Sequence, residues 1–241
     1  MKRPPVRRII IGATCFIDAN AAIPIAVQLA SQSNGEIEGL LVEDEAILDY
    51  AASPSARVVN LKGSSIERVT QGKMLDAFRR DASAFKKMLS ASAGDAFVTW
   101  TFQSWRGQFT SLIDRTTNAG DMVLFGYSRA KLSPGEIIVV CDDVTAPEAL
   151  INVAVKIAAE RRLPLVILLP PSINETVAKY LNRMNMDQSH ISIVSGADEV
   201  LEYLSKRSPI AVLLSKSRLL DMGLRILMDA ARCPVIVMKT D

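Results

Sequence analysis

Histidine is almost absent from this chain, and cysteine and aromatic residues are scarce. The 241 residues include one histidine, His190, three cysteines and 5% aromatic residues. A histidine-based hydrolase or a His/Cys metal site needs clustered residues of these types, and His190 stands near no nucleophile motif. The sequence also lacks GxSxG, GxGxxG and a Walker loop. We therefore expect a protein that is not an enzyme and that binds no metal ion.

The cysteines give no sign of a disulfide framework. Cys15, Cys141 and Cys233 are odd in number, lie far apart and have no CxxC spacing. Free thiols of this kind are typical of a reducing compartment. We expect a cytoplasmic protein.

Charge of one sign is not in excess either. The chain has 28 basic and 26 acidic residues, scattered without a basic stripe, which disfavours nucleic acid as a partner. With 49% hydrophobic and 22% charged residues, the chain can fold around one large core or two small ones. The composition predicts a globular protein without a membrane partner.

The amino terminus carries the one feature that argues for export. The stretch "MKRPPVRRIIIGATCFI" has the basic start and short apolar run of a signal peptide, although Asp18 interrupts the run. A copy of this stretch occurs in the middle of the chain, where a signal peptide cannot lie. We therefore interpret residues 8–14 as a buried strand at the start of a domain.

The internal copy is part of a repeat that spans the chain. Residues 9–30 align with residues 137–158 without a gap, and seven of the 22 positions are identical. A second ungapped match places residues 120–129 over residues 209–218, with identities that include the terminal Ser-Arg pair. The sequence thus predicts two copies of one unit, residues 1–132 and residues 133–241.

Each copy alternates short apolar runs with helical stripes. The continuous apolar runs are typical of parallel strands that helices cover on both faces. This βα alternation predicts an α/β fold with doubly wound parallel sheets, the two copies packing as a pseudo-dimer. The expected strands are residues 9–13, 37–42, 97–102 and 122–125 in copy one, and residues 137–141, 165–169, 191–194 and 211–214 in copy two.

The copies differ in two places. Copy one has a long insertion, residues 43–95, with a polar loop at residues 53–73 and a helix at residues 73–93 whose apolar stripe indicates core packing. Copy two instead has a tail that copy one lacks, a helix at residues 219–231 and a strand at residues 234–238.

With these features in place, the chain resembles the universal stress protein family in a tandem form. The resemblance rests on the first strand running into "GATCFID", the small-residue helix after it, the "VLFGYSR" end of the fourth strand and the terminal "ARCPVIVMK". It implies strand order 3-2-1-4-5 in copy two and the same order without strand five in copy one.

The family has members that bind ATP and members that do not. Binders carry an aspartate after the first strand and, after the fourth strand, a GxxG pattern followed nine residues later by glycine and serine or threonine. Glycines there let backbone N–H groups approach phosphates, helped by the positive end of the next helix. The aspartate position falls on Asp143 in copy two and on Cys15 in copy one.

Most of the phosphate-binding pattern is missing from both copies. The loop in copy two has one glycine and carries Asp221 where phosphate would approach, and copy one runs into a linker without a helix. The serines and arginine of these loops also fit a solvated loop, and Asp143 also fits helix-start chemistry. The candidate ligand-binding residues are Cys15, Gly126, Ser128, Arg129, Asp143, Ser215, Ser217, Arg218 and Gly223.

We expect a non-enzymatic stress-response protein without a cofactor, which acts by binding a protein partner or a small ligand. An alternative is an ATP or AMP binder with at most slow hydrolysis. A third hypothesis is a redox sensor that works through Cys15, whose thiol at a strand end facing a helix would have a lowered pKa; the competing interpretation is a buried, inert thiol.

The last strand suggests an oligomer. Residues 234–238 are apolar and, as strand five, would lie at the edge of the sheet, where unpaired backbone groups invite a partner. The corresponding strand often mediates dimerisation in the family. We expect a homodimer with Val235 and Val237 in its interface, or, failing that, an edge covered by the inserted residues 44–73.

Overall fold

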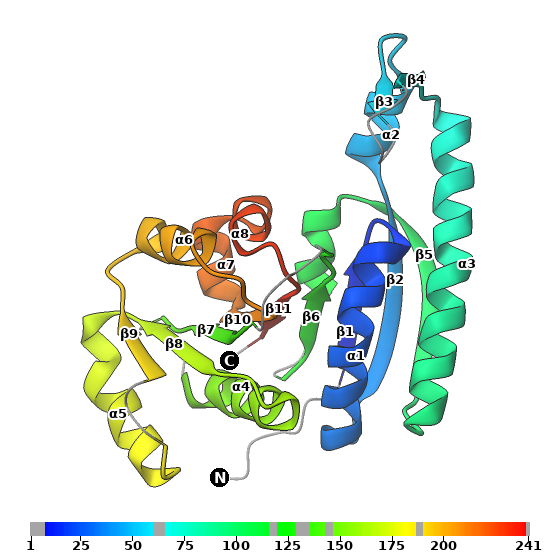
Figure 1. The fold of residues 1–241 in the computed structure, drawn as a ribbon. Coiled ribbons are helices and arrows are strands. Elements are labelled where there is room, and N and C mark those ends of the chain that lie inside the picture. Colours follow the sequence, from blue (N-terminus) through cyan, green and yellow to red (C-terminus); the bar gives the residue numbers. More distant parts are fainter. Residues whose placement is uncertain are drawn as a thin grey trace.

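A single large sheet organises the chain. The computed structural model describes residues 8–59, 66–115, 120–128, 135–142, 147–186 and 190–239. Their nine-stranded sheet has the order β5-β2-β1-β6-β11-β10-β7-β8-β9, with helices on both faces (Figure 1). The expected α/β fold with a mostly parallel, doubly wound sheet is confirmed. It is one continuous sheet, however, where we expected two sheets packed together.

The N-terminal half, described over residues 8–128, supplies four parallel strands in the expected order 3-2-1-4. Continuous burial of residues 9–13 explains why an almost purely apolar run lies in the middle of this half. The elements are β1 (Arg8–Ala13), α1 (Phe16–Ser33), β2 (Glu36–Asp44), β5 (Trp100–Gly107), the 3-10 helix η1 (Phe109–Arg115) and β6 (Met122–Phe125).

The C-terminal half, described from residue 135, supplies five strands in the order 3-2-1-4-5, as expected. Its elements are β7 (Ile137–Val140), α4 (Pro147–Arg161), β8 (Leu165–Leu169), η2 (Pro171–Ile173), α5 (Asn174–Arg183), β9 (Ile191–Ile193), α6 (Ala197–Ser205), β10 (Ala211–Ser215), α7 (Lys216–Met222), α8 (Leu224–Ala231) and β11 (Val235–Met238).

The insertion in the N-terminal half is more structured than we expected. It contains α2 (Glu45–Ala52), an antiparallel pair β3 (Arg57–Val59) and β4 (Ile66–Arg68), and the long helix α3 (Gln71–Asp95). The polar segment that we interpreted as a loop therefore holds two short strands. The apolar stripe of α3 is core, as expected, because Phe78, Phe85 and Leu89 are buried.

Three local expectations are wrong. The third strand begins at Trp100 instead of residue 97, because Phe97 lies in a left-handed turn that ends α3. Among its described residues, the connection between β5 and β6 has the 3-10 helix η1 where the alternation of strands and helices predicted a regular helix. The last helix is two helices, since Gly223 adopts a φ of 77° and separates α7 from α8.

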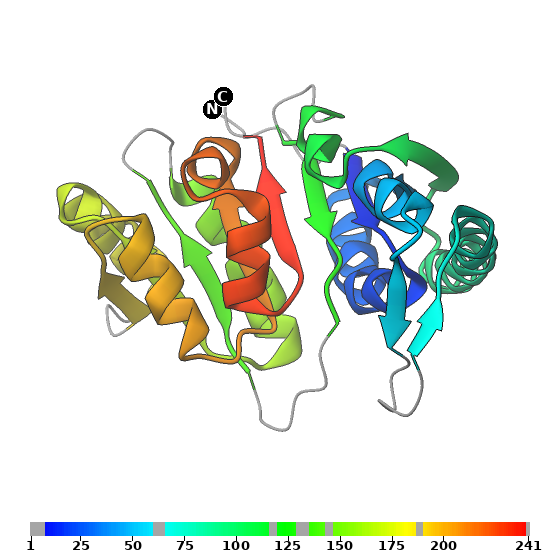
Figure 2. The ribbon, with the colours of Figure 1, turned by 90° about the horizontal axis from the view of Figure 1, so that it is seen from above.

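The strand β11 lies in the middle of the sheet, and this overturns the edge-strand prediction. It pairs in parallel with β10 and antiparallel with β6, so four strands lie on each side of it (Figure 2). Val235 and Val237, which we expected between two chains, are fully buried within this one. The element that covers β11 is β6, not the inserted segment, because no fifth strand occupies that edge among the described residues of the N-terminal half.

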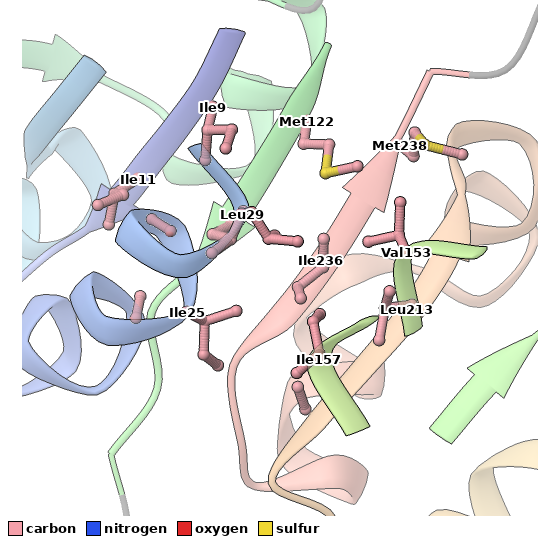
Figure 3. Packing of buried hydrophobic residues seen from close by; sticks show 14 of the residues in the cluster. Ile9, Ile11, Ile25, Leu29, Met122, Val153, Ile157, Leu213, Ile236 and Met238 are labelled. Atoms are coloured by element: carbon pink, nitrogen blue, oxygen red, sulfur yellow. The ribbon is translucent and has the colours of Figure 1, made fainter. Parts of the chain in front are cut away.

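Apolar side chains from both halves meet across β11. On one face Ile236 lies in a cluster with Ile25 and Leu29 from α1 and with Val153 and Ile157 from α4 (Figure 3). The two helices also exchange polar contacts, since Arg161 Nε donates to Gln28 Oε1 at 3.0 Å. The opposite face of the sheet is covered by η1, α6, α7 and α8. The halves therefore share one core instead of touching at a surface.

This arrangement predicts that Val237→Asp unfolds the protein. The substitution places a carboxylate in the middle of the sheet with no partner, so we expect it to lower the free energy of unfolding by about 4 kcal/mol or more. Urea denaturation followed by circular dichroism measures the loss. Ile193→Asp is the control, because Ile193 lies in the edge strand β9 and is 46% exposed; we expect about 1 kcal/mol or less. A Val237→Asp protein as stable as wild type would contradict the central place of β11.

Candidate functional site

The first candidate site lies where β1 and β6 end side by side. The backbone N–H of Gly126 donates to the Gly12 carbonyl oxygen at 2.8 Å, and the chain then passes the first turn of α1. There the N–H of Ser128 donates to Asp18 Oδ1 at 2.7 Å. The Cys15 thiol, at the N-cap of α1, donates to Asp18 Oδ2 at 3.3 Å. The Asp18 carboxylate thus accepts the hydrogen bond from a backbone N–H that a phosphate at this place would need.

Gly126 has a structural explanation that does not involve a ligand. A Cβ atom at this position would lie 2.6 Å from the backbone oxygen of Asp18, far inside van der Waals contact. Glycine is therefore required for the end of β6 to pack against the start of α1. Its presence in the sequence is not evidence for a phosphate.

The Cys15 thiol is not activated. Burial raises the pKa of Cys15 to about 11, and the negative charge of Asp18 also acts to raise it. Burial likewise raises the pKa of the Asp18 carboxyl, against the N–H of Ser128, which acts to lower it. The lowered pKa that a redox sensor at Cys15 would need is contradicted, and the inert-thiol interpretation is favoured.

The second candidate site lies where β7 and β10 end, and it is organised by Asp142. This carboxylate is buried, and Oδ2 accepts hydrogen bonds from the hydroxyls of Ser215 and Ser217, the latter at 2.9 Å. Ser215 also caps α7, since its Oγ accepts from the N–H of Arg218 at 3.1 Å. The hydroxyls that we proposed as ligand donors are therefore engaged with a carboxylate.

The rest of the second loop brings in the guanidinium of Arg218 and the carboxylate of Asp221. Arg218 Nε is buried and makes no hydrogen bond, and Arg218 Nη1 lies 3.9 Å from Asp221 Oδ2. Gly223 forms the bend between α7 and α8, and its positive φ accounts for the choice of glycine. An anion in this loop would meet the carboxylates of Asp142 and Asp221, so the residues present do not fit a polyphosphate.

The candidate residues form two clusters rather than one site. Because β6 is antiparallel to β11 and β10 is parallel to it, the carboxyl ends of β1 and β6 lie at the opposite end of the sheet from those of β7 and β10. Cys15, Gly126 and Ser128 belong to the first cluster, and Ser215, Ser217 and Arg218 to the second. Arg129 and Asp143 lie outside the described residues.

Sequence reasoning missed the two residues that organise these clusters, Asp18 and Asp142. In the sequence Asp18 stands out only as a break in an apolar run, and Asp142 stands next to the residue that the family pattern selects. Asp18 reaches Ser128 across 110 positions and Asp142 reaches Ser217 across 75. The signal available in the sequence was an aspartate close behind each first strand, where the carboxyl ends of neighbouring strands meet.

The described residues give little support to a histidine-based site, a metal site or a membrane-spanning helix. His190 Nδ1 lies 2.8 Å from the Leu165 carbonyl oxygen, which ties the ring to β8. Within the described ranges of the chain, no three His, Cys, Asp or Glu side chains gather in a way that could hold a metal ion. Within the same ranges, no helix combines the length and apolar character needed to cross a membrane.

Comparison with known proteins identifies the fold. No protein-family model matches the chain, and no curated protein matches it either. A universal stress protein from Archaeoglobus fulgidus superposes with a TM-score of 0.57 at 10% identity, covering 99% of this chain and 98% of that one. A putative universal stress protein from Pseudomonas aeruginosa gives 0.53 at 13% identity, with 98% and 94% covered. A functionally unknown protein from the same species gives 0.54 at 13% identity, with 98% and 93% covered. The chain has the universal stress protein fold, over both halves.

The environment of Cys15 predicts slow thiol chemistry. With a pKa of about 11, roughly one Cys15 thiol in a thousand is ionised at pH 8, so we expect iodoacetamide to modify it at least about tenfold more slowly than in the urea-unfolded chain. Mass spectrometry of peptides locates the label. Asp18→Asn should speed the reaction because it removes a charge that disfavours the thiolate. If Cys15 reacts as fast in the folded as in the unfolded chain, the inert-thiol interpretation is wrong.

Proposed function

We propose that this chain is a non-enzymatic stress-response protein of the universal stress protein type, which acts by binding a protein partner or a small ligand. The fold likeness to universal stress proteins over nearly the whole of both chains supports this. None of its three cysteines forms a disulfide in the structure, which supports a reducing, cytoplasmic location.

We infer that the two halves descend from one repeated unit, residues 1–132 and 133–241. The equal strand order 3-2-1-4 in the two halves supports the inference. The gapless alignment pairs Gly126 with Ser215 and Ser128 with Ser217. The paired residues lie at the end of the fourth strand in each half. In the N-terminal half they contact the start of α1, and in the C-terminal half they lie at the start of α7.

The observation that carries the proposal is that both loops after the fourth strands are bound to carboxylates of the chain itself. Asp18 accepts from the Ser128 N–H, and Asp142 accepts from the Ser215 and Ser217 hydroxyls. In ATP-binding relatives of this fold the same places would serve phosphates. Nucleotide phosphates carry negative charge, so a carboxylate fixed at this position opposes them.

The second candidate function, binding of ATP or AMP with at most slow hydrolysis, has one observation in its favour. Arg218 Nε is buried without a hydrogen-bond partner, so this guanidinium keeps a donor for an anion. Lys216, the other cation of this loop, is paired with Asp114 at 3.1 Å. The charges of Asp142 and Asp221 therefore oppose the Arg218 donor. We rank this function below partner or small-ligand binding for this reason.

The proposal predicts weak ATP binding. Calorimetry should give a dissociation constant on the order of hundreds of micromolar or weaker, roughly −5 kcal/mol or less of binding free energy. Asp142→Asn keeps a hydrogen-bond acceptor for the serines and removes the charge, so we expect ATP binding to tighten by about threefold to tenfold.

Asp229→Asn, an exposed carboxylate on α8, is the matched control and should change nothing. Low-micromolar affinity of the wild-type chain, or nucleotide retained through purification, would overturn the proposal in favour of nucleotide binding.

A further inference from the structure

The two outer edges of the sheet are very different. At one end β9 has three residues, whereas at the other end β5 has eight, Trp100–Gly107. Among the described residues no strand pairs with the outer side of β5. Helix α3 covers one face of this strand near Phe102, which stacks edge-to-face on Phe85, but helices do not pair with a strand edge. A long edge of this kind is a template for another strand.

The usual protections of an edge are missing from β5. Its sequence WTFQSWRG has no proline and no lysine, and Thr101, Gln103, Ser104 and Arg106 are exposed. Its one charged residue, Arg106, is directed toward the neighbouring strand, where Nη2 lies 2.9 Å from Glu43 Oε2. Nothing in the strand itself prevents edge-to-edge pairing.

The direction of the backbone groups is set by the pairing with β2. The N–H of Ile37 donates to the Thr99 carbonyl oxygen at 2.9 Å, and Ile37 stands opposite Trp100 in the parallel register. Odd-numbered residues therefore direct their N–H and C=O groups toward β2. By alternation, the groups of Trp100, Phe102, Ser104 and Arg106 point outward.

Phe97, just before β5, is an unexplained exposed aromatic residue. Phe97 N–H donates to Gly94 O at 3.1 Å and Val98 N–H to Ala93 O at 2.9 Å, the pattern of a Schellman motif that ends α3. The residue has a φ of 55°, where glycine is favoured, and its side chain is 97% exposed. Both the strain and the exposure are unfavourable in a single chain, and an outlier of this type calls for a functional explanation.

We propose that β5 pairs antiparallel with β5 of a second copy of this chain, about a two-fold axis through Gln103. In this register Arg106 of one chain stands opposite Trp100 of the other, twice by symmetry, which places a cation against an aromatic face. Thr101 stands opposite Trp105, a β-branched residue against an aromatic residue. The outward-pointing residues form the hydrogen-bonded pairs, as an antiparallel ladder requires.

The strand is complementary to itself, and this selects a second copy as the partner over an unrelated peptide. Each favourable cross-strand pair occurs twice, and the central pair is Gln103 with Gln103. Phe97 lies three residues before Trp100, which stands opposite Arg106 of the other chain, so its exposed ring is at the end of the paired strands, where a second chain can cover it. The surface lies far from Val235 and Val237, and it is independent of the proposed function because neither carboxylate cluster contributes to it.

Sedimentation of the full chain tests the interface. Wild type should sediment as two chains at about 100 μM, and Ser104→Pro should sediment as one, because it removes an outward N–H without affecting the β2 ladder. Ser104→Thr keeps the N–H and is the matched control, so it should remain two chains. Phe97→Gly should weaken association at least about tenfold while raising the melting temperature of the single chain, because it relieves the left-handed strain.

Cysteine cross-linking tests the register, even if Ser104→Pro fails to fold. Two Gln103→Cys residues would meet across the axis as a non-hydrogen-bonded pair, within about 4.5 Å between Cα atoms, which permits a disulfide. Thr101→Cys residues would be four residues out of register and should not cross-link. Wild type, which keeps Cys15, controls for cross-links through the natural thiols. A single-chain wild type, a dimer insensitive to Ser104→Pro, or cross-linking of Thr101→Cys in place of Gln103→Cys would overturn the proposal.

Discussion

The double pairing of β11 is the constraint on which the rest of the structure depends. This one strand closes the inner edge of both halves. It pairs in parallel with β10 on one side and antiparallel with β6 on the other. Without β11 the N-terminal half would end at β6, a buried apolar strand with an open edge. Because Ile236 also packs with α1 and α4 at once, the two halves bury their inner faces together and cannot be separated at a simple surface.

That single strand also fixes the direction in which the two halves face. A strand that is parallel to one neighbour and antiparallel to the other turns the second half over relative to the first, so the two clusters of candidate residues lie at opposite ends of the sheet. In each cluster a carboxylate holds the loop after the fourth strand. The carboxylates come from non-equivalent positions, the first turn of α1 in one half and the residues just after β7 in the other.

The two outer edges of the sheet are different strands. The inner edges of the two halves are joined through β11 in one sheet, so β5 and β9 are its edge strands. The insertion between β2 and β5 adds α3 against the N-terminal edge and ends in the strained turn at Phe97. The insertion that distinguishes the N-terminal half thus lies around β5, whereas the contacts between the two halves are concentrated around β11.

The sequence by itself determined the strands whose residues are continuously apolar and the core stripe of α3, because these depend on local periodicity. The strand order of each half came from the resemblance to the universal stress protein family, since periodicity does not say which strands are neighbours. It misplaced the start of β5, since the apolar character of Phe97 favours a strand while the end of α3 requires a left-handed residue there. Only the tertiary structure decided which strand meets β11 and which carboxylates hold the two loops. Asp18 and Asp142 reach partners 110 and 75 positions away, and contacts over such distances depend on how the chain closes on itself.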